Sequence, residues 1–162
     1  MHTPHHTTAQ PMRYALLLRG INVGGKHKVS MDRLKADLME LGFCSVVSYI
    51  NSGNLFFDSS EPEEVIRRTL ARYCDASYDF PVPFIIISAA TLRQEVARLP
   101  SWWQDDTAYR RDALFYLPEA DTAAIEAETA TWANDREQLY FGRTAFFYCC
   151  LLYTSPSPRD RG

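Results

Sequence analysis

Apolar residues follow two alternating periodicities over residues 12–88. Four short apolar runs, bounded by Gly, Pro, Asn or Asp, predict strands at residues 13–21, 45–51, 54–58 and 81–88. Apolar residues three or four positions apart predict one helix at residues 31–41 and a second that begins at a Ser60–Glu63 capping box. The order strand, helix, strand, strand, helix, strand predicts a ferredoxin-like unit, with both helices on one face of a four-stranded antiparallel sheet.

Residues 89–149 show only the first part of the same order. After a short helix at residues 91–99, which Pro100 terminates, the pattern predicts a strand, a helix and a hairpin, with no closing helix or strand. We therefore expect an α+β protein of two tandem ferredoxin-like (βαββαβ) units, one at residues 12–88 and a second, incomplete one at residues 89–149. Residues 1–11 are expected to form a flexible tail. The incomplete unit is expected to leave the aromatic residues of its hairpin partly exposed, namely Tyr140, Phe141, Phe146, Phe147 and Tyr148.

Residues 150–162 differ in composition from the rest of the chain. They follow the last apolar run without a turn or a helix cap, and they contain several Ser and Pro residues. Residues 150–160 are also identical to one translated reading frame of the transposase adapter used to prepare sequencing libraries. We therefore expect residues 150–162 to be an adapter-derived extension, with the natural chain truncated near Cys149. The alternative is a natural Pro- and Ser-rich disordered tail.

The composition excludes several classes of protein. The 162 residues are 46% hydrophobic and 23% charged, as in ordinary globular proteins, and no apolar run reaches the ~20 residues of a membrane helix. A net charge of −3 argues against wrapping of duplex DNA through bulk charge. The four Cys residues are too scattered for a disulfide framework, and residues 1–11 lack the apolar stretch of a secretory signal. We therefore expect a cytoplasmic protein.

A glycine-rich loop follows the first predicted strand and gives the clearest chemical signal in the sequence. Residues 20–27 nearly match the phosphate-binding pattern G-x-x-x-x-G-K-[ST], but His27 replaces the hydroxyl residue that would ligate Mg²⁺. The following helix is predicted to begin at Met31, too late for its free N–H groups to line the loop. These differences argue against a nucleoside triphosphate P-loop, and we expect His27 to be a solvated loop residue.

A simpler anion site is compatible with the same loop. Glycines let backbone N–H groups approach an anion, and an arginine can bind a phosphate or carboxylate through two N–H groups. Residues 1–60 also carry six Lys or Arg and only four Asp or Glu. The leading hypothesis is a small anionic or phosphate-bearing ligand, held by Arg19, Asn22, Gly24, Gly25, Lys26 and Lys28, with Ser52 and Asn54 as neutral partners. The alternative is that the glycines only turn the chain and that the lysines are solvated. The sequence leaves open whether the hairpin at residues 51–54 adjoins this loop.

Two motifs connect the chain with a known family. The segments LLLRGINVGGKHKVSM (residues 16–31) and YINSGN (residues 49–54) resemble the bacterial domain-of-unknown-function 1697 family, and the resemblance extends over about residues 12–149. It implies two tandem ferredoxin-like units in a cytoplasmic protein whose biochemical activity is not established. Members of that family continue through a further helix and a Thr-x-Arg-Asn-Trp-like strand. The resemblance therefore also implies that the second unit is incomplete here.

Two other classes of function stay open. A ferredoxin-like sheet binds single-stranded nucleic acid through aromatic residues on its central strands, and Tyr14 with Phe56 or Phe57 would then face its open side. The sequence lacks the Lys/Arg-Gly-Phe-Gly-Phe pattern of such sheets, however, and we expect the second unit to cover that face. A non-catalytic assembly protein is the third hypothesis. We assign no catalytic residue, no cofactor and no metal site.

Overall fold

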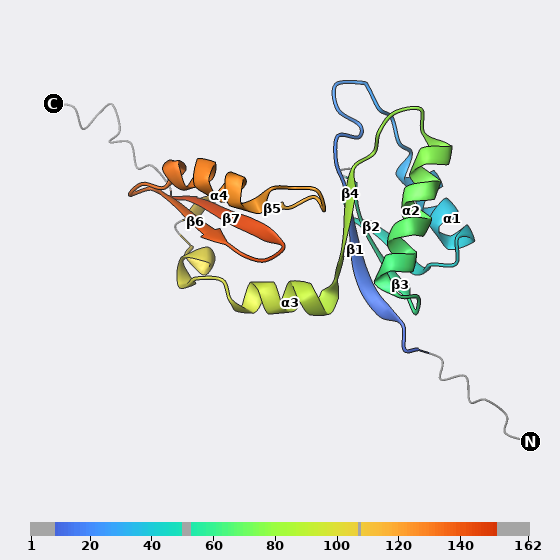
Figure 1. Cartoon of the computed structure of the whole chain (residues 1–162), viewed down its shortest axis with the longest axis horizontal. Helices are drawn as coiled ribbons and strands as arrows, with labels where there is room; N and C mark the ends of the chain where they lie inside the picture. Colours follow the sequence, from blue (N-terminus) through green and yellow to red (C-terminus); the bar gives the residue numbers. More distant parts are fainter. Residues whose placement is uncertain (1–8, 50–52, 107, 152–162) are drawn as a thin grey trace, which may run out of the picture. The chain divides into compact units, whose positions relative to one another are not determined.

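The computed structural model describes residues 9–49, 53–106 and 108–151. The chain divides into two units, Met1–Leu92 and Arg93–Gly162, which we call unit 1 and unit 2 (Figure 1). Each unit contains one antiparallel sheet with helices, so the predicted α+β class is confirmed. Among the described residues, no helix is both long and apolar enough to cross a bilayer. Most of the predicted extension, residues 152–162, and residues 1–8 of the predicted tail lie outside the described residues.

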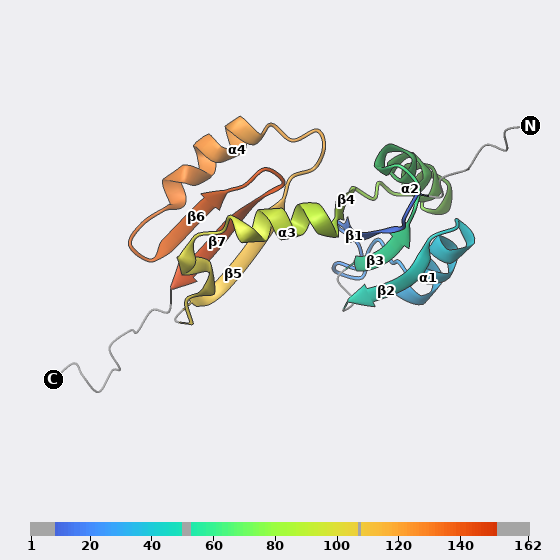
Figure 2. The same ribbon diagram turned by 90° about the horizontal axis from the view of Figure 1, so that it is seen from below.

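Unit 1 consists of a four-stranded sheet with both of its helices on one face (Figures 1 and 2). The strand order is β2-β3-β1-β4, and every neighbouring pair is antiparallel. In chain order the elements are β1 (Met12–Leu18), α1 (Met31–Glu40), β2 (Cys44–Tyr49), β3 (Asn54–Ser59), α2 (Glu63–Ser77) and β4 (Phe84–Ser88). The predicted order of strands and helices in this part of the chain is therefore confirmed.

The core of unit 1 lies between this sheet and the two helices. Alternate residues of the two central strands point into it, because successive side chains of a strand point to opposite faces. The helices contribute apolar residues at four-residue spacing, and four of these are at most 2% exposed, namely Leu34, Leu38, Ile66 and Leu70. These core residues include Tyr14, Leu16, Leu34, Leu38, Leu55, Phe57, Ile66 and Leu70. Since full burial of one such side chain contributes about 1.5–3 kcal/mol, the core fixes the register of the strands that carry the loops described below.

Some elements begin at other residues than predicted, because of backbone hydrogen bonding. β4 begins at Phe84 rather than at residue 81, since the two prolines just before it have no N–H to give to a neighbouring strand. The predicted capping box at Ser60 is wrong. The helix α2 begins after Pro62 without a side-chain cap, and Ser59 Oγ instead accepts a hydrogen bond from Glu61 N (3.2 Å).

Unit 2 contains a three-stranded antiparallel sheet with the order β5-β7-β6. The helix α4 lies on one face of this sheet, and the 3-10 helix η1 lies on the other (Figures 1 and 2). The elements are α3 (Ala89–Ala97, which begins in unit 1), η1 (Ser101–Gln104), β5 (Ala108–Phe115), α4 (Thr122–Thr129), η2 (Ala130–Trp132), β6 (Glu137–Phe141) and β7 (Ala145–Leu151). The last strand thus includes Cys150 and Leu151, the first two residues of the predicted extension.

The expected exposure of the hairpin aromatics is wrong for two of the five residues. Phe146 and Phe147 are only 6% and 2% exposed, whereas the other three are half-buried. Phe147 is covered by Trp103, whose ring packs edge-on against it with the centroids 5.3 Å apart. An aromatic residue of η1 therefore shields the face of the sheet opposite α4.

A buried carboxylate connects α3 with the turn between β6 and β7. Glu95 is 3% exposed, and its Oε1 accepts hydrogen bonds from Thr144 N (2.9 Å) and Thr144 Oγ1 (3.2 Å). A Cβ at Gly142 would clash with the same oxygen and lie 2.8 Å from Glu95 Cδ. The turn therefore needs glycine at this position, because the carboxylate occupies the space of a side chain.

Candidate functional site

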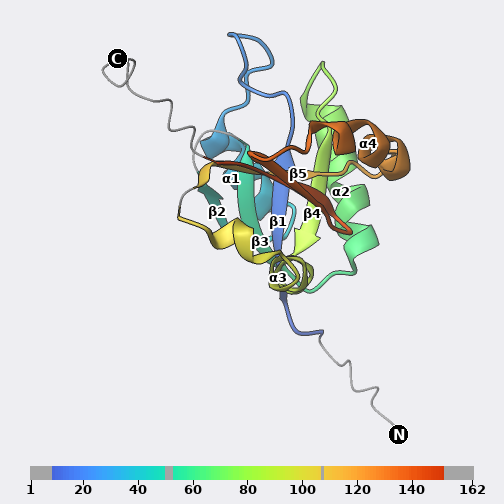
Figure 3. The ribbon, with the colours of Figure 1, turned by 90° about the vertical axis from the view of Figure 1, so that its left-hand side faces the viewer.

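The glycine-rich loop lies between β1 and α1 at one end of the unit 1 sheet. It projects beyond the strands, beside the connection from α2 to β4 (Figures 1 and 3). β1 ends at Leu18 rather than at residue 21. In the loop, Lys26 N donates to Val23 O (3.0 Å), and Gly24 and Gly25 have φ angles of 59° and 74°. These are features of a type I′ turn, which glycine adopts without strain. The turn at Gly24–Gly25 that the sequence suggests is therefore present.

Asn22 holds the two sides of the loop together at its base. Its Oδ1 accepts a hydrogen bond from Val29 N (2.8 Å), and its Nδ2 donates to Val29 O (3.0 Å). Its backbone N also donates to His27 O (2.9 Å). Asn22 adopts a φ of 54°, a conformation that asparagine tolerates better than most residues. The loop is therefore a braced structure, and Asn22 has a structural role that its residue type alone did not reveal.

His27 is exposed, but it is not a free loop residue. Its ring stacks on that of Phe80, with the centroids 4.4 Å apart and an interplanar angle of 12°. Its Nδ1 lies 3.2 Å from Gly20 O. The expectation of a solvated loop histidine is therefore confirmed, and the structure adds that its ring also stacks on Phe80. The stacking partner comes from the connection between α2 and β4, so no local feature of the sequence could have identified it.

Arg19, Lys26 and Lys28 carry the positive charge of the loop, and all three are exposed. The backbone N of Arg19 donates to Pro83 O (2.9 Å), which fixes the first residue of the loop to the segment before β4. Within the described part of the chain, none of the three side chains forms an ion pair with Asp or Glu. The positive charges of this loop are therefore not neutralised by any described carboxylate.

The hairpin between β2 and β3 adjoins the base of this loop. Gly53 O accepts a hydrogen bond from Leu18 N (3.0 Å), and a Cβ at Gly53 would lie 2.9 Å from Ile21 Cδ1. Asn54 is the first residue of β3 and pairs with Leu17 of β1. Ser52 lies outside the described residues. The sequence left open whether this hairpin adjoins the loop. The structure brings Asn54 to the end of the sheet where the loop begins.

The prediction that Tyr14 faces the open side of the sheet, where it could stack on a nucleic acid base, is wrong. This residue is 3% exposed and stacks on Phe57 within the core, with the ring centroids 5.6 Å apart. Phe57 is fully buried, so it does not face solvent either. Phe56 alternates with Phe57 along β3 and therefore points to the opposite face, where it is half-buried. Only one of the three aromatic residues thus lies on the face without helices.

Among the described residues, no group of three or more His, Cys, Asp or Glu side chains is arranged to hold a metal ion. The chemistry of the loop is instead that of exposed cations on a braced backbone. Such an arrangement can attract and bind an anion, and it contains no described nucleophile paired with a base.

Comparison with protein-family models identifies the family of this chain. The family model described as "Protein of unknown function (DUF1697)" matches residues 12–147. None of the curated proteins matches the chain. Among solved structures, the chain is similar to the conserved bacterial protein SP0830 from Streptococcus pneumoniae, with 38% sequence identity and a TM-score of 0.82. That match covers 89% of this chain and 79% of the other. The chain therefore belongs to the DUF1697 family of proteins of unknown function.

Proposed function

We propose that unit 1 binds a small anionic or phosphate-bearing ligand at the loop between β1 and α1. The residues that would bind it are Arg19, Asn22, Gly24, Gly25, Lys26 and Lys28 of the loop, with Asn54 at the start of β3. Ser52, which the sequence also suggests, lies outside the described residues. One observation carries the proposal. Three exposed cationic residues lie on a braced loop, and within the described residues no carboxylate pairs with them.

The bracing of the loop favours binding because it lowers the entropy that an incoming ligand must remove. The two hydrogen bonds between Asn22 and Val29 and the stacking of His27 on Phe80 hold the backbone before any ligand arrives. A guanidinium such as that of Arg19 can donate two parallel hydrogen bonds to a phosphate, and each charge-assisted hydrogen bond contributes about 1.5–3 kcal/mol. The proposed site is open to solvent, so its affinity should fall as salt concentration rises.

Titration with pyrophosphate and with inorganic phosphate at low salt tests the proposal, by calorimetry and by backbone NMR shifts. We expect saturable binding, with the largest shifts in residues 19–29. The double variant R19Q/K26Q should bind pyrophosphate at least 10-fold more weakly, which corresponds to about 1.4 kcal/mol. The control is R68Q, which removes an exposed arginine of α2 that pairs with Glu64. The absence of saturable binding, or an equal loss in both variants, would contradict the proposal.

We also propose the finer description of the fold, in which both units are ferredoxin-like and the second is incomplete. The strand order β2-β3-β1-β4 with two helices on one face supports this for residues 12–88. The sequence of β5, α4, β6 and β7 corresponds to that of β1, α1, β2 and β3, and the order β5-β7-β6 corresponds to β1-β3-β2. Residues 89–149 offer no described counterpart of α2 and β4.

A further inference from the structure

A flat ring lies on the surface of the loop that we propose as the anion site. His27 is exposed, and its ring is stacked on that of Phe80, with the centroids 4.4 Å apart and an interplanar angle of 12°. The loop and the connection that carries Phe80 lie side by side at this end of the sheet (Figures 1 and 3). Because Phe80 covers one face of the imidazole, the exposed area of His27 includes the opposite face. That face is a flat surface on which another planar ring can stack.

The stacked pair is held in place by the rest of unit 1. His27 Nδ1 lies 3.2 Å from Gly20 O, and because a carbonyl oxygen only accepts, Nδ1 carries the hydrogen of this contact. Phe80 packs on Tyr78 with the ring centroids 5.4 Å apart, and both residues pack against the core of unit 1. The surface that His27 presents is therefore preorganised, which lowers the entropy cost of stacking a ligand ring on it.

The backbone of His27 gives a second indication. Its φ angle is 53°, in the left-handed region that residues other than glycine adopt uncommonly. Residues held in such conformations cluster at binding and active sites, because the strain persists only where the surrounding structure imposes it. The conformation at His27 places a ring at the surface, where the ring adds little to the core. The arrangement is therefore better suited to contact with a ligand than to packing.

The exposed ring and the positive charges of the loop are close together along the chain. Lys26 and Lys28 are the immediate neighbours of His27, and Arg19 directly precedes Gly20, whose carbonyl oxygen contacts the ring. All three cationic residues are exposed, and none of them pairs with a described Asp or Glu. A ligand that uses both features carries an anionic group and a flat ring, joined by a short connection.

We propose that the ligand of this loop is a free mononucleotide. Its phosphate binds to the exposed cations, as in the proposed function on which this inference rests, and its base stacks on the open face of His27. A single sugar joins base and phosphate in such a molecule, which suits a ring and cations that share one loop. A nucleic acid strand fits less well, because surfaces that bind strands combine successive aromatic residues with a groove of cations. Of the three aromatic residues considered above, Phe56 alone lies on the face without helices.

Adenosine monophosphate (AMP) and ribose 5-phosphate are the probes that test this proposal on the full 162-residue chain. Both carry a phosphate on the same sugar, but only AMP carries a base. We expect AMP to bind at least 10-fold more tightly than ribose 5-phosphate in calorimetry at low salt, which corresponds to about 1.4 kcal/mol. The backbone NMR shifts that AMP produces and ribose 5-phosphate does not should lie at residues 26–28 and 78–80.

The variant H27N separates stacking on the ligand from bracing of the loop. Asparagine also tolerates a positive φ, and its Nδ2 can donate to Gly20 O in place of the ring Nδ1, but it has no ring. H27N should therefore weaken AMP binding at least 10-fold and change ribose 5-phosphate binding less than 2-fold. If the pair only braces the loop, H27N will weaken both probes equally.

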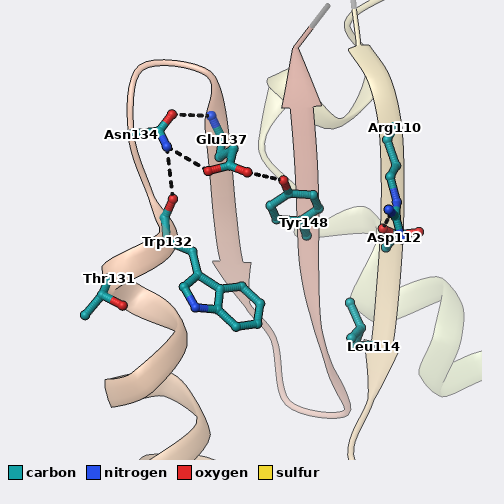
Figure 4. Close-up of a pocket in the computed structure, with 8 residues that line it drawn as sticks. All are labelled: Arg110, Asp112, Leu114, Thr131, Trp132, Asn134, Glu137 and Tyr148. Carbon is teal, nitrogen blue, oxygen red and sulfur yellow. Dashed lines mark hydrogen bonds and ion pairs between the residues drawn. The ribbon is translucent and has the colours of Figure 1, made fainter.

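The matched control is W132A, which removes an exposed aromatic ring outside the loop. Trp132 is 47% exposed and lines a hollow over the sheet of unit 2 (Figure 4). That hollow lies where unit 2 has no described counterpart of α2, so we assign it no ligand. W132A should change AMP binding less than 2-fold.

Several results would overturn the proposal. These are equal affinity for AMP and ribose 5-phosphate, an equal loss of both in H27N, AMP binding that H27N leaves unchanged, or an oligoadenylate of five nucleotides that binds at least 10-fold more tightly than AMP. If pyrophosphate binds while AMP gains nothing from its base, the proposed anion site stands and this inference fails. If neither pyrophosphate nor ribose 5-phosphate shows saturable binding, both fail. Far-UV circular dichroism establishes that H27N is folded, and if it is not, the comparison of probes on the unchanged chain decides.

Discussion

The contact between the glycine-rich loop and the β2–β3 hairpin can be tested by adding a single methyl group. In Gly53→Ala, the new Cβ would lie 2.9 Å from Ile21 Cδ1 and 3.2 Å from Leu18 Cβ. Both neighbours belong to the chain that leads into the loop, and Ile21 is 6% exposed, so it has little room to move. The φ of Gly53 is also 82°, a conformation that alanine rarely adopts.

The magnitude follows from these two effects. A positive φ costs a residue with a Cβ about 1–2 kcal/mol, and overpacking of a buried site costs about 1–3 kcal/mol. We therefore expect G53A to lower the free energy of unfolding of unit 1 by about 2–5 kcal/mol. Gly24→Ala is the matched control, because Gly24 also has a positive φ (59°) but its Cβ would meet nothing within 4 Å. G24A should lower the free energy of unfolding only by the cost of the positive φ, about 1–2 kcal/mol.

Urea unfolding, monitored by hydrogen exchange in peptides of β1 and β3, measures the difference in stability between G53A and G24A within unit 1. Ile21→Val removes the closest atom, Ile21 Cδ1, so the double variant I21V/G53A should cost less than the sum of the two single variants. The reasoning is refuted if G53A and G24A destabilise equally, or if the costs of I21V and G53A simply add. Either result would mean that the hairpin does not pack against the base of the loop.

Three further predictions concern single residues. Asn22→Ala should lower the free energy of unfolding of unit 1 by about 2 kcal/mol, because two hydrogen bonds are lost; an unchanged urea midpoint would contradict the bracing of the loop. Gly142→Ala should destabilise unit 2 by about 1–3 kcal/mol, because the new Cβ clashes with Glu95. Tryptophan fluorescence measures this loss, since all the tryptophans lie in unit 2. Adding E95A to this variant should recover part of the lost stability. Burial raises the pKa of Cys74 to about 11, so the stabilisation from its neutral thiol is present below pH 9 and is lost as pH rises through 11. At pH 8, iodoacetamide should therefore modify the exposed Cys44 at least 100-fold faster than Cys74, and equal rates would show that Cys74 is not buried.

Local sequence patterns predicted the order of elements in unit 1 because its periodic apolar positions face a single core. Leu34 and Leu38 mark the inner face of α1, and both are at most 2% exposed. Element ends were predicted less well, since they depend on particular hydrogen bonds. The helix α2 begins after Pro62 without a side-chain cap, although Ser60 and Glu63 match a capping box.

The candidate site depends on contacts between residues far apart in the sequence, which no local pattern contains. His27 stacks on Phe80, more than 50 positions later. The hairpin at Gly53 adjoins the loop only because β1 pairs with β3, and no motif contains both. The exposed charges of the loop could be predicted, because charged residues beside glycines rarely lie in a core. The hydrogen bonds that brace the loop, and the residues that adjoin it, could not be predicted.

The course of α3 has a practical consequence for any attempt to study the two halves of this protein apart. The border between the units falls between Leu92 and Arg93, inside this helix, whose nine residues are Ala89–Ala97. Ser88 Oγ accepts a hydrogen bond from Thr91 N at the start of the helix, while Glu95 bonds to Thr144. Cleavage at the border would leave each fragment with about one helical turn, too short to persist in water. Excision must therefore keep α3 whole, and the half that keeps it determines whether Glu95 retains its partner.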